Sequence, residues 1–232
     1  MSMTFFNPAE PLVRSKQEAL DFQDRQGLLR IHLQVGNKTL ISSFYSRIDQ
    51  AFIVWGWITA AIFINAQFLP VSWYVQAMFW SALTLVGTVG MVVLTHFWVK
   101  VERLRWLLYS WVALMLFGMV LTDLGIFLGW GLVLMNLCQF WLGLSTIGYF
   151  FTGMGMRSRT FLINGFVHLL GIAILPYVGG WQFLTTGLVM AGTLLLLAEV
   201  QWDMRSPIDY DVLTPEQKQF NQEQHQLRQM SI

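Results

Sequence analysis

The chain has little of the chemistry on which most enzyme sites depend. Of its 232 residues only 12% are charged, and a single one, Cys138, is cysteine. One cysteine excludes an internal disulfide and any metal site built from several thiolates. The sequence also has no H-E-x-x-H zinc motif, no Walker phosphate loop and no pair of carboxylates within an apolar stretch. These absences argue against an enzyme without excluding one.

Apolar residues are abundant by contrast, at 55% of the chain. They gather in stretches of roughly 20 residues, enough for a helix to cross a hydrocarbon core about 30 Å thick. A soluble protein with so many such stretches would keep too little polar surface for water. We therefore expect an all-α integral membrane protein, a six-transmembrane-helix bundle, with spans at 51–70, 77–99, 106–126, 130–152, 160–178 and 181–202.

All 14 Lys and Arg residues lie outside these spans. The basic residues of the short connections fall between spans two and three and between spans four and five: Lys100, Arg103, Arg105, Arg157 and Arg159. The positive-inside rule counts such loop residues, and all of them lie on one side. We therefore expect both termini in the cytoplasm and the protein in a plasma or inner membrane, or an equivalent energy-transducing membrane.

Tryptophans recur at the predicted span ends. Indole rings are enriched at membrane–water interfaces, because one edge of the ring is polar and the rest is apolar. Interfacial anchoring therefore explains this group, which comprises Trp73, Trp98, Trp106, Trp130, Trp181 and Trp202.

Two cytoplasmic tails, 1–50 and 203–232, are expected to flank the membrane domain at 51–202. No cleavable signal peptide is expected, because the first tail lacks the apolar run that such a peptide needs. Near the other end, Thr214 and Gln217 match a capping pattern and predict the start of a C-terminal helix.

The first tail contains signals for a short helix and a hairpin. Ser15 and Glu18 form an S-x-x-E capping pattern, and Gly27 is placed to end the helix that would follow. Polar and apolar residues then alternate over 30–35, and after a turn at Gly36–Lys38 a second run covers 39–44. This pattern predicts a β-hairpin. A lone hairpin is only marginally stable in water, so it would need a surface or a partner.

Spans two and four contain similar stretches. Both Phe79–Gly87 and Phe140–Gly148 read F-W-x-x-L-[ST]-x-x-G, and both precede a basic loop. A repeated helical hairpin would explain the match. Composition would also explain it, because the chain has 18 Phe, 11 Trp and 19 Gly. The sequence alone does not separate these explanations.

Polar side chains within a bilayer are costly and are the first place to look for function. His168 lies nearest the centre of span five, and Asn164, four residues earlier, shares its helix face. Span four carries a face of polar and small residues, and span one adds an amide in its outer half. If these faces meet, they form a polar seam between spans four and five. Its candidate residues are His168, Asn164, Gln139, Asn136, Thr146 and Asn65.

Three roles suit this seam. Amide and imidazole groups could hydrogen-bond across a helix contact and so hold the bundle together. They could instead line a route for a small solute. His168 could also ligate a haem or chlorin, with His96 as a second weak candidate at a different depth. No other cofactor and no metal ion are predicted.

We expect a non-catalytic membrane accessory or assembly protein, whose apolar helices pack against other membrane subunits. The alternatives are a small-solute channel or transporter that uses the seam, and a haem- or pigment-binding membrane protein. The expected partners are the lipid bilayer and other membrane subunits, with a homo-oligomer as a further option and no nucleic acid.

Overall fold

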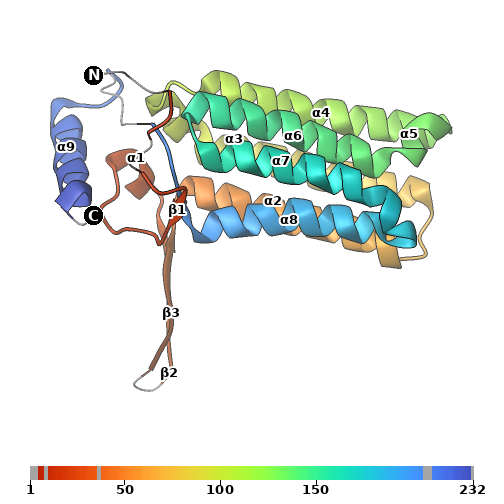
Figure 1. Cartoon of the computed structure of the whole chain (residues 1–232), viewed down its shortest axis with the longest axis horizontal. Coiled ribbons are helices and arrows are strands. Elements are labelled where there is room, and N and C mark those ends of the chain that lie inside the picture. Colours follow the sequence, from red (N-terminus) through yellow and green to blue (C-terminus); the bar gives the residue numbers. More distant parts are fainter. Residues whose placement is uncertain (1–4, 8–9, 36–37, 206–210, 231–232) are drawn as a thin grey trace.

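The computed structural model describes residues 5–7, 10–35, 38–205 and 211–230, and most of them are helical (Figure 1). Long helices lie side by side in one bundle. The segments before and after this bundle lie at the same end of it. The long helices are α2 (Arg47–Phe68), α3 (Trp73–Val101), α4 (Arg105–Phe127), α6 (Leu137–Met156), α7 (Arg159–Ile174) and α8 (Gln182–Glu199).

Five helices are long and apolar enough to cross a membrane: α2, α3, α4, α7 with the 3₁₀ turn η1 (Leu175–Tyr177), and α8 with the turn η2 (Gly179–Trp181). The predicted fourth span, 130–152, is divided into α5 (Gly131–Met135) and α6. Asn136 stands at the break, and its side-chain amide donates to the Leu132 carbonyl oxygen at 2.9 Å. Such a local bond competes with the regular hydrogen bonding of a helix.

The long helices form a closed ring in the order α2, α3, α4, α6, α7 and α8, because each packs on the next and α8 packs on α2. Glycines bring α2 and α8 close together. A Cβ added to Gly56 would meet Leu195 at 2.8 Å, and one added to Gly187 would meet Phe63 at 2.6 Å. A larger residue at either position would hold the two helices apart.

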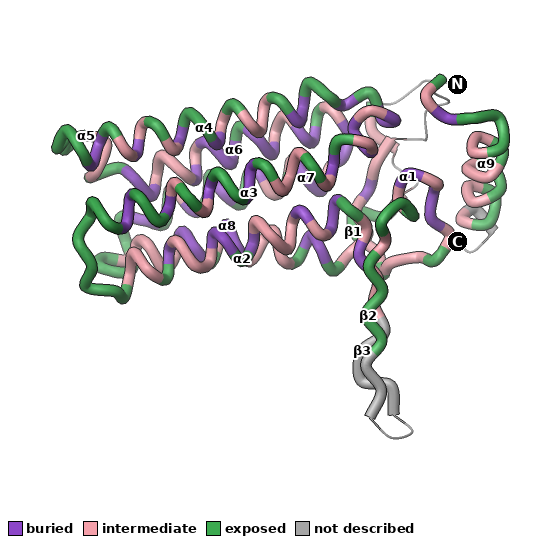
Figure 2. Tube along the Cα trace, turned by 180° about the vertical axis from the view of Figure 1, so that it is seen from behind, coloured by how far each residue is buried: buried purple, intermediate pink, exposed green. Residues whose placement is uncertain are grey.

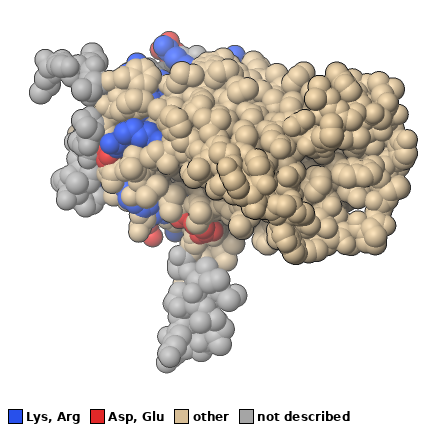
Figure 3. All heavy atoms as spheres, turned by 45° about the vertical axis from the view of Figure 1, so that its right-hand side comes forward, with Lys and Arg blue, Asp and Glu red and all other residues tan. Residues whose placement is uncertain are grey.

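The outward faces of the helices are apolar. Buried and exposed residues alternate along each helix (Figure 2), as expected when one face turns inward. Among the outward side chains, Trp57, Val93 and Leu188 are exposed by 65%, 73% and 73%. Charged residues gather instead at one end of the bundle (Figure 3). This distribution suits a bundle surrounded by lipid, with one charged end in water.

A small cap covers that charged end. Strand β1 (Val13–Arg14) pairs antiparallel with β4 (Gln201–Trp202), and so joins the segment before α2 to the segment after α8. The helix α9 (Pro215–Met230) packs beside α1 (Phe22–Arg25), where the Asn221 side-chain oxygen accepts from the Phe22 amide.

The first tail differs from expectation in its helix. Helix α1 begins at Phe22 and not after Ser15. The residues around Ser15 instead lie alongside β4, where the Gln17 amide donates to the Gln201 side chain at 3.3 Å. Gly27 comes just after α1 with a φ of 67°, a conformation that favours glycine. Tertiary contact with β4 has therefore overridden a local helix signal.

A β-hairpin follows α1. Strand β2 (Leu29–Val35) pairs with β3 (Lys38–Tyr45), from Leu29 opposite Tyr45 to Val35 opposite Lys38. Gly36 and Asn37, at the predicted turn, lie outside the described residues. At the base of the hairpin, the Tyr45 hydroxyl donates to Glu199 at 2.9 Å. The two strands leave the cap and extend across the long axis of the bundle (Figure 1).

Candidate functional site: the central cavity

The ring of helices encloses a cavity of about 150 Å³. All six long helices contribute to its lining, which reaches from Ile48 to Ala66 on α2 and from Trp80 to Val99 on α3. These separations correspond to roughly 27–29 Å along a helix. The cavity is therefore long and narrow. An apolar cavity of this volume can hold a small hydrophobic molecule.

Aromatic side chains make up much of the cavity wall. Five tryptophans line it: Trp55, Trp80, Trp98, Trp111 and Trp141. Indole rings present broad flat surfaces that pack well against planar groups, and each carries one N–H donor. Three of these N–H groups, on Trp98, Trp111 and Trp141, donate to acceptors within the protein.

Trp111 shows how an indole is held in this bundle. Its ring lies against Gly148 of α6, where an added Cβ would overlap the ring. Its Nε1 donates to Thr152 Oγ1 at 3.0 Å, and Thr152 Oγ1 donates to the Gly148 carbonyl oxygen at 2.8 Å. The glycine makes room for the ring, and the threonine four residues later accepts the indole N–H.

The same contact occurs in the opposite direction. Trp141 of α6 lies against Gly118 of α4, where an added Cβ would meet the ring at 2.7 Å. Its Nε1 donates to Thr122 Oγ1 at 3.2 Å, and Thr122 Oγ1 donates to the Gly118 carbonyl oxygen at 2.7 Å. Two matching contacts therefore join α4 to α6, each with a hydrogen bond that contributes about 0.6–2 kcal/mol in a membrane.

His168 lines the cavity from α7 and is fully buried. Its ring centroid lies 4.8 Å from that of Tyr149 on α6, and its Nδ1 lies 2.8 Å from the Asn164 carbonyl oxygen. A carbonyl oxygen can only accept, so Nδ1 carries the proton and the neutral ring offers a lone pair at Nε2. Nε2 is buried and has no hydrogen-bond partner within the described part of the chain.

The other polar residues of the predicted seam bond mainly within their own helices. The Asn164 amide donates to the Thr160 carbonyl oxygen at 3.1 Å. Thr146 Oγ1 donates to the Leu142 carbonyl oxygen at 2.9 Å, and Asn136 bonds four residues back as described above. His168 meets Tyr149 across the α6–α7 contact, whereas these three side chains make their hydrogen bonds locally.

Three further candidate residues lie apart from His168. Gln139 is partly buried on α6, and its Oε1 has no hydrogen-bond partner among the residues described. Asn65 lies on α2, whose main packing partners are α3 and α8. His96 is exposed on α3, whereas His168 is buried inside the ring. The two histidines therefore do not face a common space.

The cavity, the seam and the charged end are the features from which a function can be inferred. No protein-family model, curated protein or solved structure matches this chain. The chemistry of these features therefore has to be read from their side chains and contacts.

All five basic loop residues lie at the charged end. Arg103, Arg105 and Arg157 are exposed, whereas Lys100 and Arg159 are partly buried. Arg159 Nε lies 2.9 Å from Asp203, which follows β4. The two basic loops thus frame the end of the bundle, and one of them is fixed to the segment after α8.

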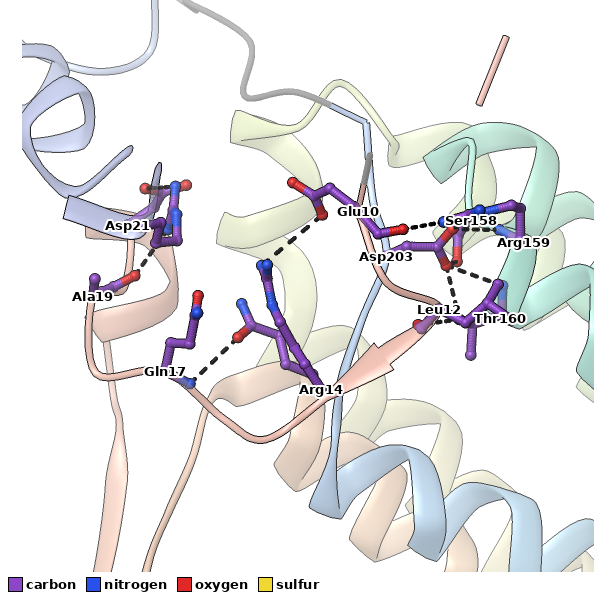
Figure 4. Close-up of polar contacts among 12 residues, drawn as sticks. Glu10, Leu12, Arg14, Gln17, Ala19, Asp21, Ser158, Arg159, Thr160 and Asp203 are labelled. Carbon is purple, nitrogen blue, oxygen red and sulfur yellow. Dashed lines mark hydrogen bonds and ion pairs between the residues drawn. The ribbon is translucent and has the colours of Figure 1, made fainter. Parts of the chain in front are cut away.

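Asp203 is the centre of this fixation (Figure 4). Its carboxylate accepts from Ser158 Oγ at 2.8 Å, from Arg159 N and Nε, and from Thr160 N and Oγ1 at 3.0 and 2.7 Å. Burial raises the pKa of this carboxyl, but the bonds from Arg159 and Thr160 outweigh burial and lower the pKa below its ordinary value. A negative charge at the N-terminus of α7 is also favourable.

Trp98 connects the cavity to the cap. It lines the cavity from α3, and its Nε1 donates to Asp24 Oδ1 at 2.8 Å. Loss of hydration, together with the neighbouring negative charges of Asp21 and Glu102, raises the pKa of Asp24 to about 7. Burial likewise raises the pKa of Glu102, although it faces the Arg205 guanidinium at 3.4 Å.

None of the cavity tryptophans was predicted from the sequence to line a site. Trp98 was expected to be an interfacial residue, yet it is 5% exposed, whereas Trp73, Trp106, Trp130 and Trp181 are 44–55% exposed. A signal for two of the others was present. Both Trp111 and Trp141 are followed by glycine seven residues later and by threonine eleven residues later. This spacing places all three on one helix face.

Proposed function

We propose that the chain crosses the membrane six times and has both termini in the cytoplasm. Helix α6 has 20 residues and lies in the ring between α4 and α7. As the fourth span in chain order, it would raise the number of spans from five to six. An even number of crossings agrees with both flanking segments lying at one end (Figure 1). The basic loops lie at that end, which the positive-inside rule assigns to the cytoplasm. A plasma or inner membrane, or an equivalent energy-transducing membrane, would suit this topology.

The function we propose is that of a non-catalytic accessory protein that binds another membrane protein. The observation that carries this proposal is the β2–β3 hairpin, which extends across the bundle axis (Figure 1). If the bundle axis runs across the bilayer, the hairpin lies along the cytoplasmic membrane surface. Strands of seven and eight residues reach about 25 Å at 3.3 Å per residue. This length reaches past the chain's own bundle and over a neighbouring one.

The chemistry of the hairpin supports a protein partner. Leu29 and Ile31 are 49% and 42% exposed, and they lie on one face of β2 because strand side chains alternate. Arg30 and His32 lie on the other face. Two strands on their own are marginally stable, so an arm of this kind gains stability from whatever covers its apolar face. A neighbouring membrane subunit would supply such a surface where its helices end at the cytoplasmic face of the membrane.

The experiment is isolation of the intact protein from its native membrane in a mild detergent. We expect a second membrane protein to co-purify in a fixed ratio with the unchanged chain and with His32→Gln. Ile31→Asp should release it, because a carboxylate replaces an apolar contact. Purification of the chain alone, with no crosslink from a photoreactive residue at position 31, would refute the proposal.

Of the alternative functions, haem or pigment binding has one supporting observation. His168 Nδ1 bonds to a backbone carbonyl and leaves Nε2 available, which is the arrangement common in metal-ligating histidines. An absorption spectrum of the purified protein tests it directly. The solute route lacks comparable support, since Asn164, Asn136 and Thr146 donate to carbonyls of their own helices.

A further inference from the structure

The two basic loops each contain an arginine in an unusual backbone conformation. Arg103, just after α3, has a φ of 55°, and Arg157, at the end of α6, has a φ of 53°. In the described part of the chain these are the only non-glycine residues with a positive φ. A Cβ is disfavoured in this conformation, and helices that end in this way usually carry glycine there. An arginine at both positions therefore points to a use for its side chain.

Arg205 connects the ends of the two loops. Its backbone amide donates to the Met156 carbonyl oxygen, at the end of α6, at 2.9 Å. Its guanidinium donates to the backbone carbonyl oxygen of Glu102 and lies 3.4 Å from the Glu102 carboxylate, at the end of α3. Arg103 is the residue after Glu102. Arg157 is the residue after Met156, so Arg205 joins the two places at which the unusual arginines stand.

The charges of these side chains act on one another. Burial disfavours the charged form of Arg205, and so do the like charges of Arg157 and Arg103. Glu102 acts in the opposite direction, yet the pKa of Arg205 remains below its ordinary value. Glu102 is itself buried and also accepts from Gln23 at 2.9 Å. An additional anion beside these guanidinium groups would therefore be stabilised by them.

The start of α4 adds a further cation. Arg105 is the first residue of α4 and is exposed. This end of α4 lies against the last turn of α6, because a Cβ added to Gly155 would meet the Trp106 ring at 2.8 Å. Among the described residues, no carboxylate lies within ion-pair distance of Arg105 or Arg157. The four guanidinium groups of these two loops and of the segment after β4 form the arginine cluster: Arg103, Arg105, Arg157 and Arg205.

The arginine cluster lies at the height expected of a membrane–water boundary. Trp106 directly follows Arg105 and is 47% exposed, as is typical of an interfacial tryptophan. Further along the bundle from the charged end, Tyr109 on α4 and Met154 on α6 are exposed as well. Acyl chains could cover this outer surface while the headgroup of the same lipid meets the guanidinium groups. A soluble anion would gain nothing from the apolar surface.

We propose that the arginine cluster binds the phosphate of an anionic phospholipid whose acyl chains lie against α4 and α6. Guanidinium groups suit this ligand because they donate paired N–H bonds to phosphate oxygens. A zwitterionic headgroup also carries a phosphate, but its ammonium group cancels the net charge. Basic pockets at the cytoplasmic ends of membrane helices accordingly favour anionic lipids. This inference is independent of the hairpin and of the accessory function proposed above.

The test titrates lipids onto the full chain, purified and delipidated in a neutral detergent, and counts bound lipids by native mass spectrometry. The probes are phosphatidylglycerol and phosphatidylcholine with the same acyl chains, and inorganic phosphate as a soluble competitor. Arg157→Gly and Arg105→Gln each remove one charge from the cluster. The glycine variant suits the positive φ at position 157, so it should fold. Arg47→Gln is the matched control, because Arg47 is likewise exposed and begins α2 at the charged end.

We expect the unchanged protein to bind phosphatidylglycerol about tenfold more tightly than phosphatidylcholine, since several basic groups face one headgroup. Each cluster variant should weaken phosphatidylglycerol binding about fivefold, the effect of one basic residue beside an anionic lipid surface. Phosphatidylcholine binding should not change, and Arg47→Gln should bind both lipids as the unchanged protein does. Thermal unfolding identifies any variant that does not fold, and the other cluster position then carries the test.

Three results would overturn the proposal. The first is equal binding of the two lipids by the unchanged protein, which would favour an acidic segment of a partner protein as the occupant. The second is unchanged phosphatidylglycerol binding in both cluster variants. The third is displacement of the lipid by inorganic phosphate but not by chloride at the same ionic strength, which would assign the cluster to a soluble phosphate compound.

Discussion

Two carboxyl groups at the charged end have pKa values shifted in opposite directions, because they differ in burial and in hydrogen bonding. Asp203 accepts bonds from two backbone amides, two hydroxyls and a guanidinium, so its charged form is favoured. Asp24 has lost its hydration on burial, accepts one indole N–H bond and lies near the negative charges of Asp21 and Glu102, so its charged form is disfavoured. The two residues therefore stabilise the cap in different pH ranges.

Replacement of Asp203 by Asn should destabilise the protein by about 2–4 kcal/mol, because several donors lose a charged acceptor. Thermal unfolding in detergent measures the change, with Asp211→Asn as the control, since the Asp211 side chain is 96% exposed. A carboxyl with a lowered pKa stabilises the fold above its unfolded pKa near 4. This stability should disappear as the pH falls through the folded pKa. A variant as stable as the control would contradict the assignment.

Asp24→Asn should be stabilising, and more so at pH 8 than at pH 5.5. The folded protein holds the Asp24 proton up to about pH 7, whereas the unfolded chain releases it near pH 4. The stability linked to this group therefore falls as the pH rises from about 4 to 7 and is constant above. Asparagine keeps an oxygen for Trp98 Nε1 and removes the charge. Thermal unfolding measures the gain in stability of the variant over the unchanged protein. This gain should be about 1–2 kcal/mol larger at pH 8 than at pH 5.5.

At the scale of helices, the sequence predicts the membrane-spanning elements well, because the surrounding lipid dictates their length and composition. Five of the predicted spans correspond to helices able to cross a membrane, because a lipid environment requires long apolar helices. The late start of α1 at Phe22 depends on a contact that no local pattern contains, because the preceding residues pair with a strand nearly 190 positions away in sequence. The break at Asn136 coincides with a local side-chain bond to Leu132, but the apolar composition of the predicted span gives no sign of it.

The candidate site was harder to predict, for a related reason. His168 stands out in sequence because an ionisable residue in an apolar stretch is rare. Tryptophan is common at membrane interfaces, so Trp55 and Trp80 do not stand out until the ring of helices shows that they face inward. Their indole N–H groups are buried without a hydrogen-bond partner among the described residues, and such burial depends on packing between helices, which is a tertiary property.

Gly148 and Gly143 on α6 provide a test of the indole contacts. An added Cβ at Gly148 would overlap the Trp111 ring, whereas one at Gly143 would meet nothing within 4 Å. Gly148→Ala should therefore destabilise the protein by about 1–3 kcal/mol through overpacking. Gly143→Ala should be neutral or slightly stabilising. Thermal unfolding and the near-UV circular dichroism of the tryptophans report both effects, and equal stability of the two variants would contradict the contact.

At the scale of the whole molecule, the apolar ring of helices, the charged end and the β2–β3 hairpin together fix how the protein would sit in a membrane. The cap ties the segment before α2 to the segment after α8 through β1, β4 and Asp203, so both flanks of the bundle are held at one membrane surface. The hairpin leaves from the same surface, and the proposed contact with a neighbour depends on it. The orientation of this end therefore underlies the function proposed here.

Cysteine labelling tests the orientation. In a Cys138→Ser background, Arg103→Cys places a thiol at the charged end, and Tyr177→Cys places one at the opposite end, where the Tyr177 side chain is 87% exposed. A membrane-impermeant maleimide should label position 103 only from the cytoplasmic side and position 177 only from the other, because basic loops remain on the side of insertion. Reversed labelling would place the hairpin outside the cytoplasm. Labelling of both positions from one side would mean an even number of spans between them and would remove α6 from the membrane.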